Sequence, residues 1–170
     1  RVAQKYVENS KLWDRRKFDL RGWGLLTGGG ACDFDAYIYE PSYARLCAKS
    51  WSLDDHLLLD EKRHLSNLAV NKGSADNLLG TQSDLETMVD FEKVKGGIRK
   101  IVKALARTAH QLASTRSRSF EFLGVDIILD EDAKPWLLEC NLSPALARRN
   151  EAQSKLIDSA LRGCIKRTID

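Results

Sequence analysis

The clearest pattern along the chain is a strict alternation of charged and apolar residues that begins at Lys17. Successive side chains of a β-strand point to opposite faces, so this alternation predicts a strand. Lys17, Asp19 and Arg21 share one face of that strand. Phe18 and Leu20 share the other.

Further strands are predicted before and after this one. They lie at Val2–Val7, Asp35–Tyr39, Phe120–Leu129 and Lys134–Asn141. A polar loop, Glu8–Asp14, separates the first two strands. The run Thr27–Gly30 predicts a permissive turn rather than a phosphate cradle, because no helix with Lys-Ser or Lys-Thr follows it.

Two segments have the apolar periodicity of amphipathic helices. After Gly96-Gly97, one helical face carries Ile98, Ile101, Val102, Leu105, Ala109 and Leu112. The chain closes with a second helix at about Glu151–Ile169. Residues Trp51–Asp76 are predicted to be irregular, and Ser114–Ser119 interrupts the pattern. This order of elements predicts an α+β fold, built on a mainly antiparallel sheet with packed helices.

Composition indicates the class of protein but does not indicate a reaction or a ligand. The 170 residues are 43% hydrophobic and 30% charged, which is typical of a globular domain with one core. We expect no membrane span, because no stretch approaches about 20 uninterrupted apolar residues. A net charge of +3 does not indicate nucleic acid. The four cysteines show no metal-ligand spacing. The first residues lack a signal peptide and an initiating Met, so we expect the sequence to start inside a larger protein.

The strongest chemical signal is a set of oxygen-bearing side chains in two apolar strands. Asp126 interrupts Val-Asp-Ile-Ile-Leu, while Glu139 and Asn141 end the next strand. With a four-residue loop at Glu131–Lys134, Asp126 would lie directly opposite Glu139, and Asn141 would share their face. Such a set suits Mg²⁺, although a protonated or salt-bridged pair explains it equally well from geometry alone.

Two weaker constellations have both functional and structural interpretations. Lys17 and Arg21 can bind phosphate and Asp19 can accept from a ribose hydroxyl, but an exposed charged strand face has the same pattern. His64 stands in His-Leu-Ser-Asn, and a lone histidine is usually structural.

Five segments in order resemble the tubulin tyrosine ligase-like family. They are Gln4–Tyr6, Arg16–Arg21, His64–Asn67, Phe120–Ile127 and Lys134–Pro144. The resemblance implies an ATP-grasp fold, of which residues 1–170 would form the C-terminal part without the N-terminal part. It also implies ATP and Mg²⁺ as cofactors. A carboxylate would attack the γ-phosphate of ATP to give an acylphosphate, from which an amine displaces phosphate.

The resemblance implies a role for each matching residue. The metal ligands would be Asp126, Glu139 and Asn141. The nucleotide would be held by Gln4, Lys5, Tyr6, Lys17, Asp19, Ser66 and Asn67. Arg21 would reach the phosphates or the acyl intermediate, and His64 would line the site near the phosphates. Glu40 stands where many members carry a phosphate-binding Arg, so Arg45 is the expected basic residue instead.

The leading functional hypothesis is ATP-dependent ligation of glutamate to tubulin tails, because Lys134–Pro144 most resembles the polyglutamylase-like group. The alternatives are a glycine ligase of the same family, a catalytically inactive microtubule-binding module and an unrelated ATP-grasp ligase for small molecules. Tyrosine also stays open as the donor. The implied partners are the acidic tails of tubulin or microtubules and a free amino acid. The implied location is cytoplasmic and cytoskeletal, with the cilium or basal body included. We expect residues 1–170 alone to be inactive.

Overall fold

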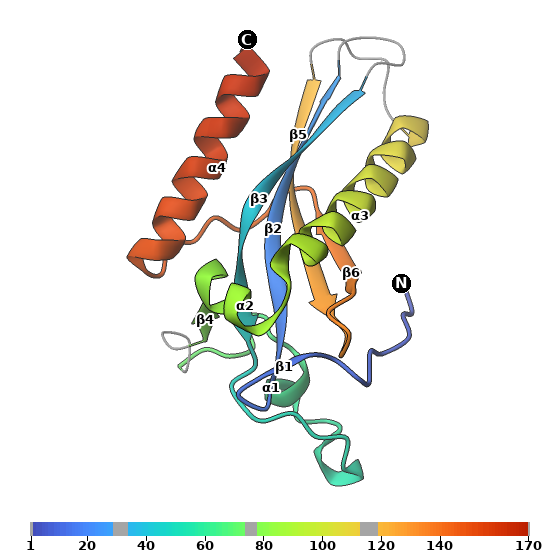
Figure 1. The fold of residues 1–170 in the computed structure, drawn as a ribbon, viewed down its shortest axis with the longest axis vertical. Helices are drawn as coiled ribbons and strands as arrows, with labels where there is room; N and C mark the ends of the chain where they lie inside the picture. Colours follow the sequence, from blue (N-terminus) through green and yellow to red (C-terminus); the bar gives the residue numbers. More distant parts are fainter. Residues whose placement is uncertain (1, 29–33, 74–77, 113–118, 170) are drawn as a thin grey trace.

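A computed structural model describes residues 2–28, 34–73, 78–112 and 119–169. Its centre is a tall antiparallel sheet in which the strand order is β4-β3-β2-β5-β6, and β1 pairs with β2 beside this path (Figure 1). The strands are β1 (Leu12–Trp13), β2 (Arg16–Gly28), β3 (Phe34–Leu46), β4 (Leu79–Gly80), β5 (Ser119–Leu129) and β6 (Pro135–Asn141). The predicted antiparallel sheet with packed helices is therefore confirmed.

The predicted alternation in β2 decides which side of the sheet becomes core. Phe18 and Leu20 are buried with Val125 and Ile127 of β5 in one apolar cluster. On that face lie α2 (Gln82–Met88) and α3 (Phe91–Leu112), whose buried residues include Val94 and others of the same cluster. Burial of these side chains is the main stabilising term for the fold.

The opposite face of the sheet is divided between an apolar half and a charged half. α4 (Glu151–Ile169) covers the apolar half, where Ile157 and Ala160 pack against Trp23 and Tyr43. The charged half carries Lys17, Asp19, Arg21, Arg45 and Asp126, and beside it run the short helices η1 (Asp55–Leu57) and α1 (Glu61–His64). All five charged residues are buried, so the interpretation of Lys17, Asp19 and Arg21 as an exposed strand face is wrong.

Several predicted elements differ from the structure. β3 continues to Leu46 rather than ending at Tyr39, the predicted loop Glu8–Asp14 contains β1, and the predicted irregular segment Trp51–Asp76 contains η1 and α1. Val2–Val7 forms no strand; the N-terminal segment instead runs along the β5–β6 hairpin, where Lys11 N donates to Leu129 O at 2.9 Å. Gly96 and Gly97 lie inside α3 rather than before it, and at Gly97 the missing side chain lets the helix approach the Pro135 ring. The helix α2 and strand β4 were not predicted, and a Thr81–Asp84 capping box marks the start of α2.

The β5–β6 hairpin reaches the predicted pairing by a different route. Asp130 N donates to Lys134 O and Ala133 has φ 59°, so the loop is one residue shorter than Glu131–Lys134. Leu129 therefore faces Pro135, and a bulge at Leu138 restores the register. Asp126 lies opposite Glu139 as predicted.

Several expectations fall on parts that lie outside the described residues. These are the turn at 29–30, the end of the irregular segment at 74–76 and most of the polar break at 114–118. Nothing in the described helices has both the length and the apolar character needed to cross a bilayer.

The contact between α3 and the hairpin gives a matched pair of variants. A Cβ at Gly97 would lie 2.8 Å from Pro135 Cδ, whereas a Cβ at Gly96 has no neighbour within 4 Å. Gly97→Ala should lower the free energy of unfolding by about 1–3 kcal/mol through overpacking. Gly96→Ala should raise it by about 0.5–1 kcal/mol through helix propensity. Urea unfolding of both variants tests this, and equal shifts of the same sign would contradict the packing.

Candidate active site

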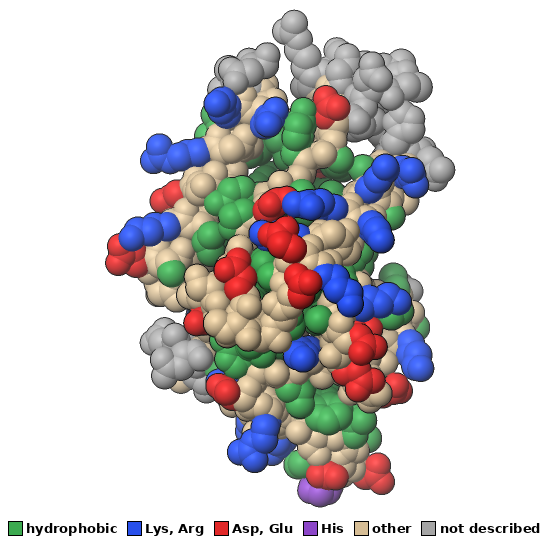
Figure 2. Space-filling model, in the orientation of Figure 1, with side chains coloured by type: hydrophobic (Ala, Val, Ile, Leu, Met, Phe, Trp, Pro, Cys, Tyr) green, Lys and Arg blue, Asp and Glu red, His purple; other side chains and the backbone are tan. Residues whose placement is uncertain are grey.

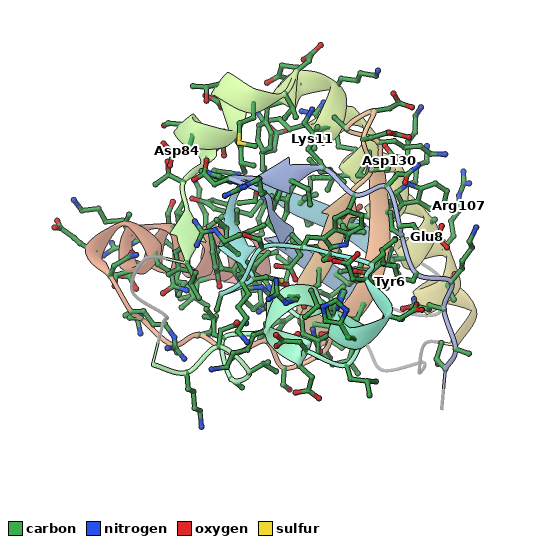
Figure 3. All side chains as sticks on the ribbon, turned by 90° about the horizontal axis from the view of Figure 1, so that it is seen from below. Tyr6, Glu8, Lys11, Asp84, Arg107 and Asp130 are labelled. Atoms are coloured by element: carbon green, nitrogen blue, oxygen red, sulfur yellow. The ribbon has the colours of Figure 1, made fainter. Side chains whose placement is uncertain are left out.

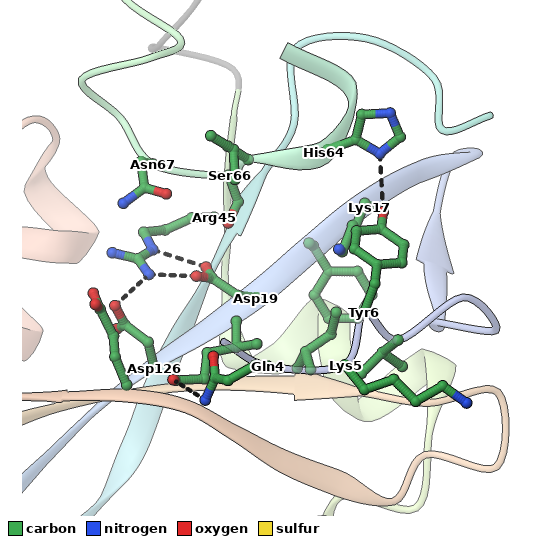
Figure 4. A pocket seen from close by; sticks show the side chains of 16 residues that line it. Gln4, Lys5, Tyr6, Lys17, Asp19, Arg45, His64, Ser66, Asn67 and Asp126 are labelled. Carbon is green, nitrogen blue, oxygen red and sulfur yellow. Dashed lines mark hydrogen bonds and ion pairs between the residues drawn. The ribbon is translucent and has the colours of Figure 1, made fainter. Parts of the chain in front are cut away.

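The charged half of the sheet forms the floor of a pocket of about 310 Å³ (Figure 4). Its walls come from the N-terminal segment, the α1 loop and β6. Every residue that the sequence predicted as functional lines this pocket except Arg21 and Asn141. Segments separated by more than 100 positions in the chain are thus brought to one place, and a volume of this size is within the range of small-molecule sites.

Four buried side chains of alternating charge form a network from β3 to β5, and three of them, Arg45, Asp19 and Asp126, line the pocket. Arg45 Nε donates to Asp19 Oδ1 at 2.8 Å, and a second, shorter bond joins Arg45 Nη2 to Asp19 Oδ2. Arg45 Nη2 also lies 2.9 Å from Asp126 Oδ2. Arg21 donates to Asp126 from Nε at 2.5 Å and from Nη2 at 3.1 Å. Asp19 lies directly opposite Arg45 in the pairing of β2 with β3, and Arg21 lies directly opposite Asp126 in the pairing of β2 with β5. The strand register therefore sets these contacts.

The two arginines keep Asp126 ionised although it is only 2% exposed. Burial raises the pKa of this carboxyl, but hydrogen bonds from Arg21 and the charge of Arg45 outweigh burial and lower the pKa below its ordinary value. Burial likewise opposes the charge of Arg45, and its bonds to Asp19 outweigh that effect and raise its pKa. The network therefore pairs two carboxylates with two guanidinium groups, and its formal charges balance.

Arg21 differs from its expected position. It does not line the pocket but lies behind Asp126 and holds both of its oxygens. In this arrangement Arg21 orients Asp126, and direct contact with phosphates or an acyl intermediate stays a prediction.

Lys17 is the one charged residue of the β2 face that the balanced network leaves out. Its side chain is buried, its Nζ lies 3.8 Å from the centre of the Tyr6 ring, and it makes no ion pair with any described residue. Burial is the main reason that its pKa falls to about 8. A buried ammonium at the pocket wall without a carboxylate partner is suited to receive an anion.

Tyr6 ties the N-terminal segment to the α1 side of the pocket. Its hydroxyl is hydrogen-bonded to His64 Nδ1 at 2.9 Å and accepts from Trp51 Nε1 at 3.2 Å. Gln4, two residues earlier, donates to Leu138 O at 3.0 Å. Figure 3 shows Tyr6 on the opposite side of the strands from Asp84 of α2. The N-terminal segment thus bridges both walls of the pocket.

Two supporting residues were missed by sequence reasoning. Trp51 bonds to the pocket residue Tyr6, and Asn71 bonds to the loop that carries Ser66 and Asn67. Asn71 is fully buried and donates to Leu65 O and Asn67 O, while its Oδ1 accepts from Ala48 N. The polar Asn71 carries no period or spacing that marks it as buried, so no signal in the chain could have found it.

The last two matched segments contact each other at Gly124. A Cβ there would lie 2.6 Å from Pro144 Cβ, so only glycine lets the chain after β6 pack onto β5. This packing continues from Asn141, whose Nδ2 donates to Glu139 Oε1 at 3.0 Å. Asn141 does not line the pocket, but it orients Glu139, which does.

The donor set has the chemistry of a Mg²⁺ site. A carboxylate has about four acceptor positions, and the guanidinium groups use three of those on Asp126. Glu139 is exposed and makes no ion pair with any residue that the structure describes. Among these residues no cluster of three His, Cys, Asp or Glu is present, but Mg²⁺ commonly uses one or two carboxylates together with substrate phosphates. Asp126 and Glu139, with Asn141 beside them, therefore fit such an ion.

The balanced network generates a stability prediction. Arg45→Met should destabilise the fold by about 3–5 kcal/mol, because it leaves Asp19 buried without a countercharge. Adding Asp19→Asn should recover part of that loss, since Arg21 and Asp126 remain as a balanced pair. Urea unfolding at pH 7 measures both, and a double variant less stable than Arg45→Met alone would contradict the proposed balance.

Comparison with known proteins identifies the family of this chain. Residues 1–170 match the tubulin-tyrosine ligase family. The chain is 33% identical to tubulin glycylase 3E of Tetrahymena thermophila, over 94% of this chain and 13% of that protein. It is 33% identical to probable tubulin polyglutamylase TTLL9 of Mus musculus, over 91% of this chain and 35% of that protein. It is 31% identical to tubulin polyglutamylase TTLL6 of the same organism, over 94% of this chain and 22% of that protein.

These relatives are much longer, and the chain spans between 13% and 35% of their lengths. Glycylases and polyglutamylases match at similar identity. On a match that covers the whole length of the sequence, the chain belongs to the tubulin-tyrosine ligase family.

Proposed function

We propose that this protein is an ATP-dependent ligase that joins an amino acid to a tubulin tail. The observation that carries the proposal is the pocket in which buried Lys17 faces the balanced Asp19–Arg45–Asp126–Arg21 network. In such a pocket Lys17 offers a cationic position for a phosphate, and Asp126 and Glu139 offer two carboxylates for a metal ion. The residues form an ATP-grasp-like half-site on an antiparallel sheet.

ATP and Mg²⁺ would supply the activation of a substrate carboxylate as an acylphosphate, from which an amine displaces phosphate to form an amide or isopeptide bond. The chain's own residues bind and orient. Lys17 would neutralise phosphate charge, while Glu139 and Asp126 would hold the metal ion. Arg45 and Arg21 keep Asp126 charged and fixed in direction, which is the preorganisation that such a site needs.

The N-terminal segment and the α1 loop would enclose the nucleotide. Gln4 is anchored on Leu138 O, and Tyr6 is anchored on His64 and Trp51, so the intervening backbone is held along the pocket edge. Ser66 is buried at the pocket wall and supplies a hydroxyl. These contacts support the nucleotide-binding roles expected for both segments.

The position of Glu40 supports an active enzyme over an inactive binding module. Glu40 forms an ion pair with Arg99 of α3, on the side of the sheet away from the pocket. Arg45 lies in the pocket instead and contacts both Asp19 and Asp126. The missing arginine at position 40 therefore removes no charge from the pocket.

Glutamate is the donor that we propose, on the resemblance of the β6 segment to polyglutamylases. Glycine is the second candidate, because tubulin glycylases of Tetrahymena thermophila match the chain at 33% and 31% identity. On the family resemblance alone, we propose a cytoplasmic location with the microtubule cytoskeleton, the cilium or basal body included.

A mass measurement tests the reaction and names the donor. The full-length protein is incubated with microtubules and Mg-ATP, with glutamate and glycine offered separately. Intact-mass spectrometry should show tubulin gaining mass in steps of one donor residue. Glu139→Gln should abolish the steps because it removes a metal ligand, whereas Glu151→Gln on α4 should keep them. Co-sedimentation with microtubules without any mass gain would favour the inactive module.

Lys17 generates a pH prediction for nucleotide binding. Its pKa of about 8 is depressed by burial, and a bound phosphate would favour the charged form and raise that pKa. Affinity for ATP should therefore be greatest below pH 8, fall as pH rises above it, and be accompanied by proton uptake. Calorimetry in two buffers of different ionisation enthalpy measures that uptake.

Two variants of neighbouring lysines control this measurement. Lys17→Met should bind ATP more weakly and lose the pH dependence. Lys5→Met removes an exposed lysine of the same pocket and should retain it. A Lys17→Met protein with the same pH profile as the wild type would assign the titration to another group.

A further inference from the structure

The solvent-facing side of α3 carries a row of positive charges. Between Phe91 and Thr108 the helix has six basic residues and one acidic residue, Glu92. Figure 2 shows Lys and Arg side chains along the part of this face that α3 occupies. We define the basic stripe as the four members Lys93, Lys100, Lys103 and Arg107, all of which are exposed.

The other two basic residues of the helix are neutralised locally. Lys95 Nζ lies 2.7 Å from Glu92 Oε1, and Arg99 is paired with Glu40. None of the four stripe residues forms an ion pair with any part of the chain that the structure describes. The charge of the stripe is therefore uncompensated within the described protein.

The stripe is straight because its spacing follows the helical repeat. Its members are 7, 3 and 4 residues apart, so they lie on one side of the helix. The buried residues Phe91, Val94, Ile98 and Val102 occupy the opposite side. At a rise of about 1.5 Å per residue the stripe is about 21 Å long, which is the length of about six residues of extended peptide.

The residues on this face of α3 favour one class of anionic partner over a membrane surface and over single-stranded nucleic acid. From Phe91 to Thr108 the apolar side of α3 is already buried in the core, so this part of the helix has no free apolar face to insert into a membrane surface. No aromatic residue lies among the exposed positions from 92 to 108, so the stripe offers no stacking platform for single-stranded nucleic acid. A row of flexible lysines at this spacing suits a chain of carboxylates.

We infer that the basic stripe of α3 docks an acidic polypeptide segment of about six residues, on the side of the sheet opposite the pocket. This inference rests on the proposed function, whose acceptor is an acidic tail. α3 packs on the apolar face of the sheet, whereas Asp19, Arg45 and Asp126 lie on the other face. Figure 3 shows Arg107 at the periphery of the molecule. A segment bound there leaves the pocket free, so the stripe holds the acidic surface while another segment is modified.

Binding to a glutamate-rich synthetic peptide tests the inference without ATP or a donor amino acid. The full-length protein should bind the peptide with an affinity that falls as salt concentration rises. Lys100→Gln/Lys103→Gln should weaken binding roughly tenfold, because two contact charges are lost. Lys100→Arg/Lys103→Arg should bind as the wild type does, since it keeps the charges.

The matched control removes two exposed cations from α4. Arg162→Gln/Lys166→Gln changes the net charge equally and should leave peptide affinity unchanged. An equal loss in both Gln variants, or no loss in the α3 variant, would overturn the inference, as would tighter binding of a DNA duplex through Lys100 and Lys103. Peptide binding that persists while tubulin gains no mass would refute the proposed function and leave the docking intact.

Discussion

A network of four charged side chains is buried in the middle of the sheet, and it consists of Arg21, Asp126, Arg45 and Asp19. The pocket is arranged around this network. A buried charge is tolerated only when a countercharge lies at hydrogen-bond distance. Neighbouring strands satisfy this condition through register, because Asp19 faces Arg45 and Arg21 faces Asp126. A slip of one residue would place these charges in the apolar core.

The two faces of the sheet have different roles, and the charged network occupies one of them. The apolar face provides stability through α2 and α3, so the charged face is free to carry chemistry. Gly97 lets α3 approach Pro135 of the β5–β6 hairpin, and Gly124 lets Pro144 approach β5. The bulge at Leu138 brings Glu139 opposite Asp126, so the proposed metal-binding pair depends on a backbone irregularity.

Residues outside the conspicuous motifs hold the pocket walls in place. Asn71 fixes the loop of Ser66 and Asn67 to the end of β3, and Trp51 fixes Tyr6 beside His64. Such residues act through backbone carbonyls or a second side chain. Their importance is a property of the folded arrangement, and neither residue shows it in its local sequence.

The sequence by itself determined the antiparallel sheet, the charged and apolar faces of β2 and the helix α4, because period is a local quantity. The pairing of Asp126 with Glu139 was predicted from a four-residue loop, but the folded chain reaches it through a shorter loop and a bulge at Leu138. Tertiary structure alone decided that Lys17, Asp19 and Arg21 are buried, that Arg21 serves Asp126, and that Val2–Val7 is no strand. These outcomes depend on partners distant in the chain: Arg21 meets Asp126 across 105 positions. No local pattern encodes which distant countercharge a residue will find, and that choice separates a solvated strand face from a buried, charged pocket.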